Sequence, residues 1–283
     1  METVQEMREQ LVAEPPSEEG VRIQAGAYLL ELSLDWIVLR ASENIHHLLG
    51  ESHVTLIEEP LGRFVQAQAL HDLRNLFSRL SGTTGIARAY GVRLTDERDH
   101  QLHDIAFQLA DGRVILEALP SANESFGQAF GSIGGLIAGL EESSGDALLD
   151  GGTRRMRALT GFDRVTLFLG DQRIESSRGA YSAPADPGPD LPMLIADTEA
   201  EPVAVFPRRT DDTSVGEALM RADNFVSLRE SGVRSAMRVI CDGGEFRCES
   251  RRRREPNLEV HAAAELFAQL FAMRLEIDRL RNR

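Results

Sequence analysis

Histidines are the residues of this sequence best suited to bind a metal ion. His46, His47 and His53 form one cluster, and His100 and His103 lie further along the chain. Adjacent histidines on a helix point about 100° apart, so this spacing does not place three ligands around one ion. We therefore interpret them as surface histidines and predict no metal site. Ligation of haem by one of them is the alternative, because a single axial histidine has no sequence signature.

Groups able to act as nucleophiles are few. Cys241 and Cys248 do not form a CxxC pair, and neither common glycine-rich phosphate loop is present. Ser227 and Ser235 have no neighbouring base that the sequence identifies. Because no nucleophile and base can be paired, we predict that the chain is not an enzyme.

One basic run, Arg247 with Arg251–Arg254, could bind phosphate or RNA. The chain carries a net charge of −14, and the run has no interleaved aromatic residues, so a nucleic-acid partner is not expected. The arginines are predicted to pair with acidic residues of the same protein or of a dimer partner.

The stretch Arg221–Ile240 has the pattern of a helix that passes through Gly232 into a strand. Such a unit forms one wall of a pocket. Between Arg221 and Arg234 this wall contains no His, Cys, Lys or Tyr. We predict a pocket wall that lacks reactive groups.

The carboxy-terminal helix, Leu258–Arg283, carries an apolar stripe with a heptad pattern. The stripe consists of Leu266, Leu270, Met273, Ile277 and Leu280, with charged flanks at Arg274, Glu276, Asp278 and Arg279. This pattern favours a parallel dimer seam formed by Leu270, Met273, Ile277 and Leu280. Packing inside the chain's own core is the alternative interpretation.

Length and composition place these segments in two domains. The chain has 283 residues, of which 42% are hydrophobic, enough for a core in each domain. We expect an amino-terminal arm at 1–20, a first domain at 21–120 and a second at 121–283. No apolar stretch approaches the roughly 20 residues of a membrane helix. With so few cysteines and no leader sequence, we expect a cytoplasmic protein without a membrane partner.

The order of predicted elements in the first domain is β-β-α-α-β-β. Strands are predicted at Val21–Leu32 and Asp35–Ala41, and Ser42–Leu49 is predicted as a helix capped by Ser42 and closed by Gly50. The strongest signal is a hairpin, HDIAFQLADGRVILEALP at His103–Pro120, which turns at Asp111-Gly112. The pattern predicts an antiparallel sheet with helices on one side.

Four motifs resemble the PAS–GAF domain pair of bacteriophytochromes. They are the segment Ser42–Gly50, the His103–Pro120 hairpin, RALTGFDRV at Arg157–Val165, and the helix-to-strand step Leu228–Ser235. The resemblance implies an α+β fold with a PAS-like antiparallel sheet, a GAF-like antiparallel sheet with flanking helices, and a long carboxy-terminal helix. It also implies that the segment near Ile23 threads a loop of the GAF domain. The family's PHY domain and kinase have no counterpart in the sequence.

The sequence departs from the family at the groups that hold its bilin. The arm at 1–20 lacks the attachment cysteine, and a pocket histidine is replaced by Asn224. Cys248 is followed by Glu249 and Ser250 where the family has two histidines, and the Asp-Ile-Pro segment is missing near 179–192. The resemblance thus implies a vestigial pocket and no bound cofactor. Its positions are Asn224, Ser227, Arg234, Glu249 and Ser250.

Two functions from different classes follow from these observations. In the first, the chain is a degenerate photoreceptor, a dimeric signalling protein that acts by binding another protein. In the alternative, it is a sensor that holds biliverdin, haem or another small ligand non-covalently in the GAF or PAS pocket.

Overall fold

The structure is a computed structural model that describes residues 20–79, 85–96, 101–121, 127–179, 192–208, 216–223 and 225–281. The arm predicted for residues 1–20 therefore lies outside the described residues, except for Gly20. By contacts the chain forms two compact units. Unit 1 contains Met1–Ser121 and Ala200–Asp223, and unit 2 contains Ala122–Glu199 and Asn224–Arg283.

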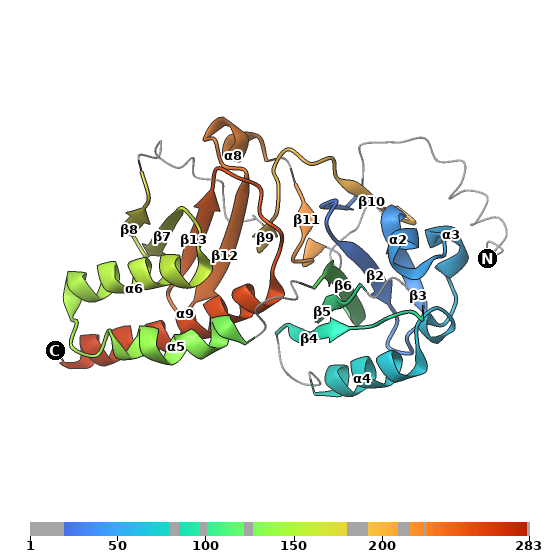
Figure 1. The fold of residues 1–283 in the computed structure, drawn as a ribbon, viewed down its shortest axis with the longest axis horizontal. Coiled ribbons are helices and arrows are strands. Elements are labelled where there is room, and N and C mark those ends of the chain that lie inside the picture. The colour runs from blue at the N-terminus through green and yellow to red at the C-terminus, as the bar shows by residue number, and fades with distance from the viewer. Residues whose placement is uncertain are drawn as a thin grey trace. The chain divides into compact units, whose positions relative to one another are not determined.

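Unit 1 is built on an eight-stranded antiparallel sheet with the order β11-β1-β10-β3-β2-β6-β5-β4 (Figure 1). Its strands are β1 (Arg22–Ile23), β2 (Tyr28–Leu32), β3 (Val38–Ser42), β4 (Ala87–Val92), β5 (His103–Ala110), β6 (Arg113–Pro120), β10 (Val203–Phe206) and β11 (Arg221–Ala222). The predicted hairpin is β5–β6. Asp111 and Gly112 both have positive φ, as a tight two-residue turn requires.

The first predicted strand, Val21–Leu32, is interrupted in the structure. β1 ends at Ile23, and the backbone N–H of Ala27 donates to the carbonyl of Gln24 before β2 begins. This turn takes the place of the middle of the strand. Ser42 precedes the helical segment as predicted, but its hydroxyl accepts a hydrogen bond from the Leu29 N–H instead of capping the helix.

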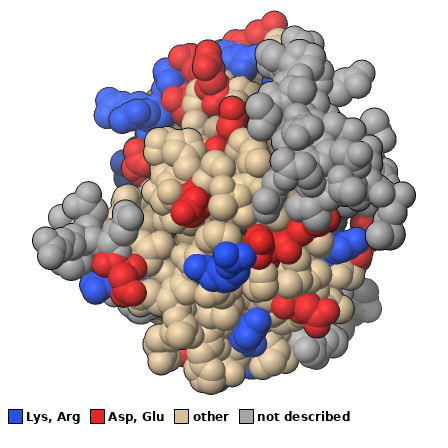
Figure 2. Space-filling model, turned by 90° about the vertical axis from the view of Figure 1, so that its right-hand side faces the viewer, with Lys and Arg blue, Asp and Glu red and all other residues tan. Residues whose placement is uncertain are grey.

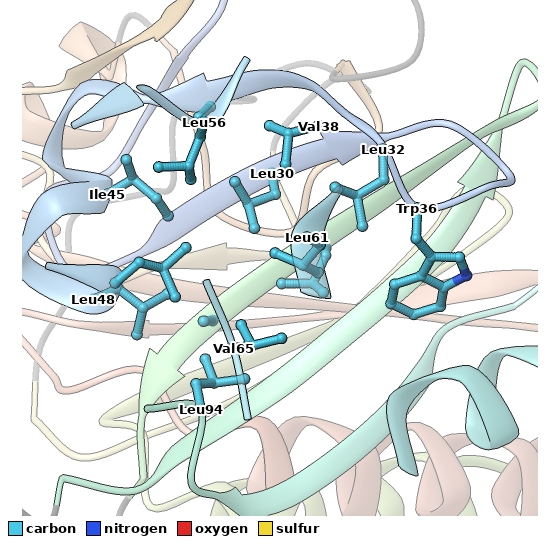
Figure 3. Packing of buried hydrophobic residues seen from close by; sticks show 14 of the residues in the cluster. Leu30, Leu32, Trp36, Val38, Ile45, Leu48, Leu56, Leu61, Val65 and Leu94 are labelled. Atoms are coloured by element: carbon cyan, nitrogen blue, oxygen red, sulfur yellow. The ribbon is translucent and has the colours of Figure 1, made fainter. Parts of the chain in front are cut away.

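Helices cover one face of this sheet. They are η1 (Glu43–Ile45), α2 (His46–Leu49), α3 (His53–Leu56), η2 (Leu61–Arg63) and α4 (Ala67–Ser78). Leu30 and Leu32 of β2 project into the same interior as Leu61, Val65 and Leu94 (Figure 3). Successive side chains of a strand point to opposite faces of the sheet. Glu31, Arg40 and Glu117 therefore lie on the other face, where they are also buried.

Residues 200–223 lie within the range assigned from sequence to the second domain, but their contacts place them in unit 1. Ile23 of β1 pairs with Val203 of β10 on one side and with Arg221 of β11 on the other. The short strand β1 therefore lies between two strands of one later segment. This is the neighbourhood in which the resemblance predicted threading near Ile23.

Unit 2 contains a five-stranded antiparallel sheet with the order β8-β7-β13-β12-β9. Its strands are β7 (Arg164–Leu169), β8 (Gln172–Ser177), β9 (Leu194–Ile195), β12 (Ser235–Cys241) and β13 (Gly244–Ser250). Its helices are α5 (Gln128–Ala138), α6 (Gly145–Thr160), α8 (Val226–Glu230) and α9 (Leu258–Arg281). The fold class expected from the sequence, two antiparallel sheets with a long carboxy-terminal helix, is confirmed.

Helices α6 and α9 pack closely against each other and against one face of this sheet (Figure 1). A Cβ atom at Gly152 of α6 would lie 2.2 Å from the ring of Phe271 in α9, so the contact requires glycine. Phe271 also packs on Phe246 of β13, with ring centroids 5.6 Å apart. Aromatic burial and one small residue together set the spacing of the two helices.

The surface of the molecule carries mixed charge. On the face shown in Figure 2, acidic and basic side chains are interspersed among neutral residues. In the part of the chain that the structure describes, none of the helices combines the length and apolar character that crossing a bilayer needs.

Candidate functional site

The predicted pocket wall is formed by α8 and β12 of unit 2. Gly232, between them, has φ of 72°, as the left-handed step at the end of the helix requires. Behind α8 the apolar residues form a closed cluster of Ile195, Phe225, Leu228, Val233 and Ala236. The wall is therefore packed against the sheet by its own side chains.

The predicted pocket positions do not converge on one site. Asn224 lies outside the described residues, and Ser227 lies in α8, where its carbonyl accepts a hydrogen bond from the Ser231 hydroxyl. Arg234 donates two hydrogen bonds to Asp197, of 2.9 and 2.7 Å, and forms an ion pair with Glu199. Hydrogen bonding to Arg234 is the main reason that the pKa of Asp197 is lowered.

Glu249 and Ser250 are neighbours in β13 and project from opposite faces of the sheet. The Ser250 hydroxyl accepts a hydrogen bond from the backbone N–H of Asp163. Glu249 lies opposite Ala236 of β12 and shares the face that α8 covers. Only Glu249 among the described positions thus points toward the predicted wall from the central strands.

Glu249 forms a buried ion pair with Arg164 of β7. Arg164 Nε donates to Glu249 Oε2 at 2.6 Å, and its Nη2 lies 2.5 Å from the same oxygen. The side chains are 1% and 4% exposed. Burial raises the pKa of the Glu249 carboxyl, and the adjacent arginine opposes this rise. This pair was not predicted, because the sequence does not show that positions 164 and 249, on strands far apart in the chain, lie side by side in register.

The same face of the sheet carries a second group of ion pairs. Arg238 donates to Glu245 at 2.7 Å, and Arg247 donates to the other oxygen of that carboxylate. The Arg247 guanidinium also lies 4.5 Å from the centre of the Phe168 ring. The face toward α8 therefore carries charged side chains along β13. These side chains form ion pairs with one another, so they are not free to act on a bound ligand.

The two thiols are buried and poor nucleophiles. Burial raises the pKa of Cys241 to about 11 and that of Cys248 to about 12. Since the thiolate is the reactive form, neither cysteine is activated for attack on a ligand.

The histidines have unequal environments. His46 and His47 are exposed, as expected, whereas His53 stacks on Phe206 and burial lowers its pKa. His103 is 7% exposed and packs edge-on against Tyr28. It is therefore a buried histidine and not a surface one. His100 lies outside the described residues, and within those residues no group of three potential metal ligands occurs.

Helix α9 presents its predicted seam to solvent. Met273, Ile277 and Leu280 are 63%, 45% and 59% exposed, and Leu270 is half-buried. The inward face of α9 uses other residues, among them Phe267, Phe271 and Leu275.

The flanks of the seam are only partly as predicted. Arg274 donates to the carbonyls of Glu141 and Ser143, and Asp278 accepts from the backbone N–H of Gly145. Both therefore fix the loop between α5 and α6 instead of flanking an exposed coil. Glu276 and Arg279 do form an exposed ion pair beside the seam.

The fold described above is that of bacteriophytochrome chromophore-binding domains. A mutant chromophore-binding domain of the Stigmatella aurantiaca bacteriophytochrome is 23% identical, with a TM-score of 0.72 over 94% of this chain and 99% of that chain. The domain of an unusual bacteriophytochrome from R. palustris is 20% identical, with a TM-score of 0.70 over 95% of this chain and 99% of that one.

The chain also matches part of a longer solved structure. The photosensory core module of the Stigmatella aurantiaca phytochrome is 22% identical, with a TM-score of 0.69; the match covers 93% of this chain and 59% of that chain. No family model matches the sequence, and no curated protein matches it at a significant level. At these identities the likeness establishes the PAS–GAF fold.

Proposed function

We propose that this chain is a bacteriophytochrome-related PAS–GAF signalling protein that has lost covalent bilin attachment and acts through dimerisation and binding to another protein. It works in the cytoplasm, without catalysis and without a nucleic-acid or membrane partner. The PAS–GAF fold supports the relation to bacteriophytochromes. The exposed apolar seam of α9, Leu270, Met273, Ile277 and Leu280, carries the proposed dimerisation.

The energetics of the seam favour a pair of chains. Three of its four side chains are more than two-fifths exposed, so pairing would remove most of their apolar surface from water. Each would contribute about 1–2 kcal/mol, which is sufficient for a dimer at micromolar concentration after the cost of association. Glu276 and Arg279 lie beside the seam, where they can pair with charges of a second copy.

Ile277→Asp tests the seam by analytical ultracentrifugation. We expect the wild type to be dimeric at tens of micromolar and Ile277→Asp to be monomeric, because a carboxylate would be desolvated in both chains. Ile240→Asp is the matched control, since Ile240 is 52% exposed on β12 of the same unit and lies outside the seam. A monomeric wild type, a dimeric Ile277→Asp, or loss of the dimer in Ile240→Asp would each place the interface elsewhere.

Loss of the chromophore is supported by two observations in unit 2. Glu249 neutralises Arg164 on the face toward α8, and neither thiol is activated. The fold itself favours the alternative, a sensor that holds biliverdin or haem without a covalent bond, because the similar structures are described as chromophore-binding domains. We expect protein co-expressed with a haem oxygenase to be colourless after purification. A red or Soret absorption band that stays with the folded protein would favour the alternative.

A further inference from the structure

A basic basin lies at one end of the sheet of unit 2. The cavity measures about 610 Å³, within the range of sites for small ligands. Its walls are Asp163, Arg178, Ser250, Arg251, Arg252, Arg253, Arg254 and Glu255. We call these residues the arginine basin.

The strand register explains why the basin collects arginines from distant parts of the sequence. The first residue of β7, Arg164, pairs with Ser177 at the end of β8 and with Glu249 near the end of β13. Arg178 therefore leaves the sheet beside the run that starts at Arg251. The backbone N–H of Arg178 donates to the carbonyl of Asp163, which fixes this meeting point.

The basin holds five arginines against two carboxylates, in a chain whose net charge is −14. Within the described part of the chain, Arg178 and Arg252 form no side-chain ion pair. Arg253 forms none either among these residues, although its charge adds to the hydrogen bonds of Arg234 in lowering the pKa of Asp197. The expected pairing of the run with acidic residues of its own chain is thus not found for Arg252 and Arg253.

Arg254 has a different role from its neighbours. Its guanidinium lies 4.5 Å from the centre of the Phe162 ring and donates to the carbonyls of Gly161 and Thr160 at 2.9 and 3.2 Å. It is therefore held in place by the loop that joins α6 to β7.

The basin adjoins a second, smaller cavity. Arg254 and Glu255 also line a cavity of about 140 Å³. The apolar part of its wall consists of Phe162, Leu194, Ile195, Ala196, Ala236, Met237 and Val260. A cationic basin thus adjoins a small apolar cavity, and the two share one ordered guanidinium.

We propose that the arginine basin binds a small molecule that carries phosphate groups, with an apolar end directed toward the cavity beside Arg254. Guanidinium groups are the side chains best matched to phosphate oxygens, and several of them in a concave site reinforce one another. The carboxylates of Asp163 and Glu255 offset only part of this charge, because the lining holds five arginines against two carboxylates. The concave form and the adjoining apolar cavity favour a small molecule over an extended polymer.

Calorimetric titration with sodium pyrophosphate at low ionic strength tests this site. We expect the wild-type protein to bind pyrophosphate, and Arg252→Gln with Arg253→Gln to weaken binding about tenfold through the loss of two charge-assisted contacts. Arg63→Gln with Arg79→Gln is the matched control. It removes the same charge from exposed positions of unit 1 and should change affinity less than twofold.

Thermal unfolding of both double variants shows whether they fold, and Arg252→Lys with Arg253→Lys gives a second comparison that keeps the charge. The site is supported if the lysine variant retains its affinity for pyrophosphate while the glutamine variant binds it more weakly. A wild type that does not bind pyrophosphate would overturn the proposal, as would equal weakening in the control. Tighter binding of a hexaglutamate peptide than of pyrophosphate would also overturn it, because the basin would then be a docking surface for an acidic protein segment.

Discussion

Replacing Glu117 with glutamine is expected to remove a pH dependence of stability from unit 1. Glu117 lies in β6 and is 1% exposed. Its two oxygens accept hydrogen bonds from the backbone N–H groups of Leu219 and Met220, at 2.7 and 2.8 Å. Burial raises the pKa of this carboxyl to about 7, and the two hydrogen bonds oppose the rise only in part.

The size of the effect follows from the pKa in the two states. The ordinary pKa of 4.5 applies to the unfolded chain, and the value of about 7 applies to the folded one. At 1.36 kcal/mol for each pH unit, the difference amounts to about 3 kcal/mol. Because the folded pKa is the higher one, this contribution is fully present below pH 4.5 and is lost as the pH rises through 7. Wild-type unit 1 should therefore be more stable at pH 5 than at pH 8.

Urea unfolding followed by tryptophan fluorescence measures this dependence. Trp36 is the single tryptophan, lies in unit 1 and is 5% exposed, so its emission reports on the unit that contains Glu117. Glu117→Gln keeps the shape of the side chain but accepts only one of the two N–H groups. We expect Glu117→Gln to be about 1–2 kcal/mol less stable than the wild type at pH 5, where Glu117 is protonated. This deficit should be removed by pH 8, because the wild type loses stability as the pH rises whereas the glutamine contributes nothing to the slope.

Two histidines of unit 1 titrate in the same range with the opposite sign. Burial lowers the pKa of His53 and of His103, so their contributions grow as the pH rises toward 6.5. Both are present in the wild type and in Glu117→Gln, and the difference between the two proteins removes them. Parallel curves for the two proteins from pH 5 to pH 8 would refute the role assigned to Glu117. So would a wild type that gains stability relative to the variant as the pH rises.

The remaining predictions concern the packing of unit 2. Gly152→Ala should destabilise the protein by about 1–3 kcal/mol in thermal unfolding, because its Cβ would overlap the Phe271 ring. Gly134→Ala in α5 is the control. It has open space around it and should be neutral or stabilising by up to about 1 kcal/mol. Equal effects would mean that α6 and α9 are not in close contact. Glu249→Ala should cost about 3–5 kcal/mol in urea unfolding by leaving Arg164 buried and unpaired, while Glu199→Ala, which removes an exposed partner of Arg234, should cost less than about 1 kcal/mol. A small loss in Glu249→Ala would show that water reaches the pair.

Local patterns were sufficient for much of the fold. The Asp111-Gly112 turn fixes a hairpin by itself, because both residues tolerate positive φ. Gly50 and Gly161 end their helices in the left-handed conformation for the same reason. Helix α9 was recognised from its spacing of apolar residues, and the exposed stripe lies where the heptad pattern placed it.

Pairing between short, distant segments could not be predicted in this way. β1 and β11 contain two residues each, too few to show any periodicity, and their partners are about 180 to 200 positions apart in the chain. The same limit applies to Glu117, whose partners are backbone groups of Leu219 and Met220. A backbone donor leaves no mark in the sequence of side chains, so the segment 216–223 gave no sign that it belongs to unit 1.

The Arg164–Glu249 pair would make the proposed loss of a chromophore site difficult to reverse. Once Glu249 neutralises Arg164 in a buried position, replacing the carboxylate alone by a neutral group leaves a buried guanidinium without its partner. A return to a ligand-holding group at this position would therefore have to be accompanied by a change at Arg164. Residues 164 and 249 lie on adjacent strands and are in register, so the two changes would have to occur together. The pair thus couples the identity of a proposed pocket position to the stability of the sheet, which would oppose single-step recovery of a ligand site.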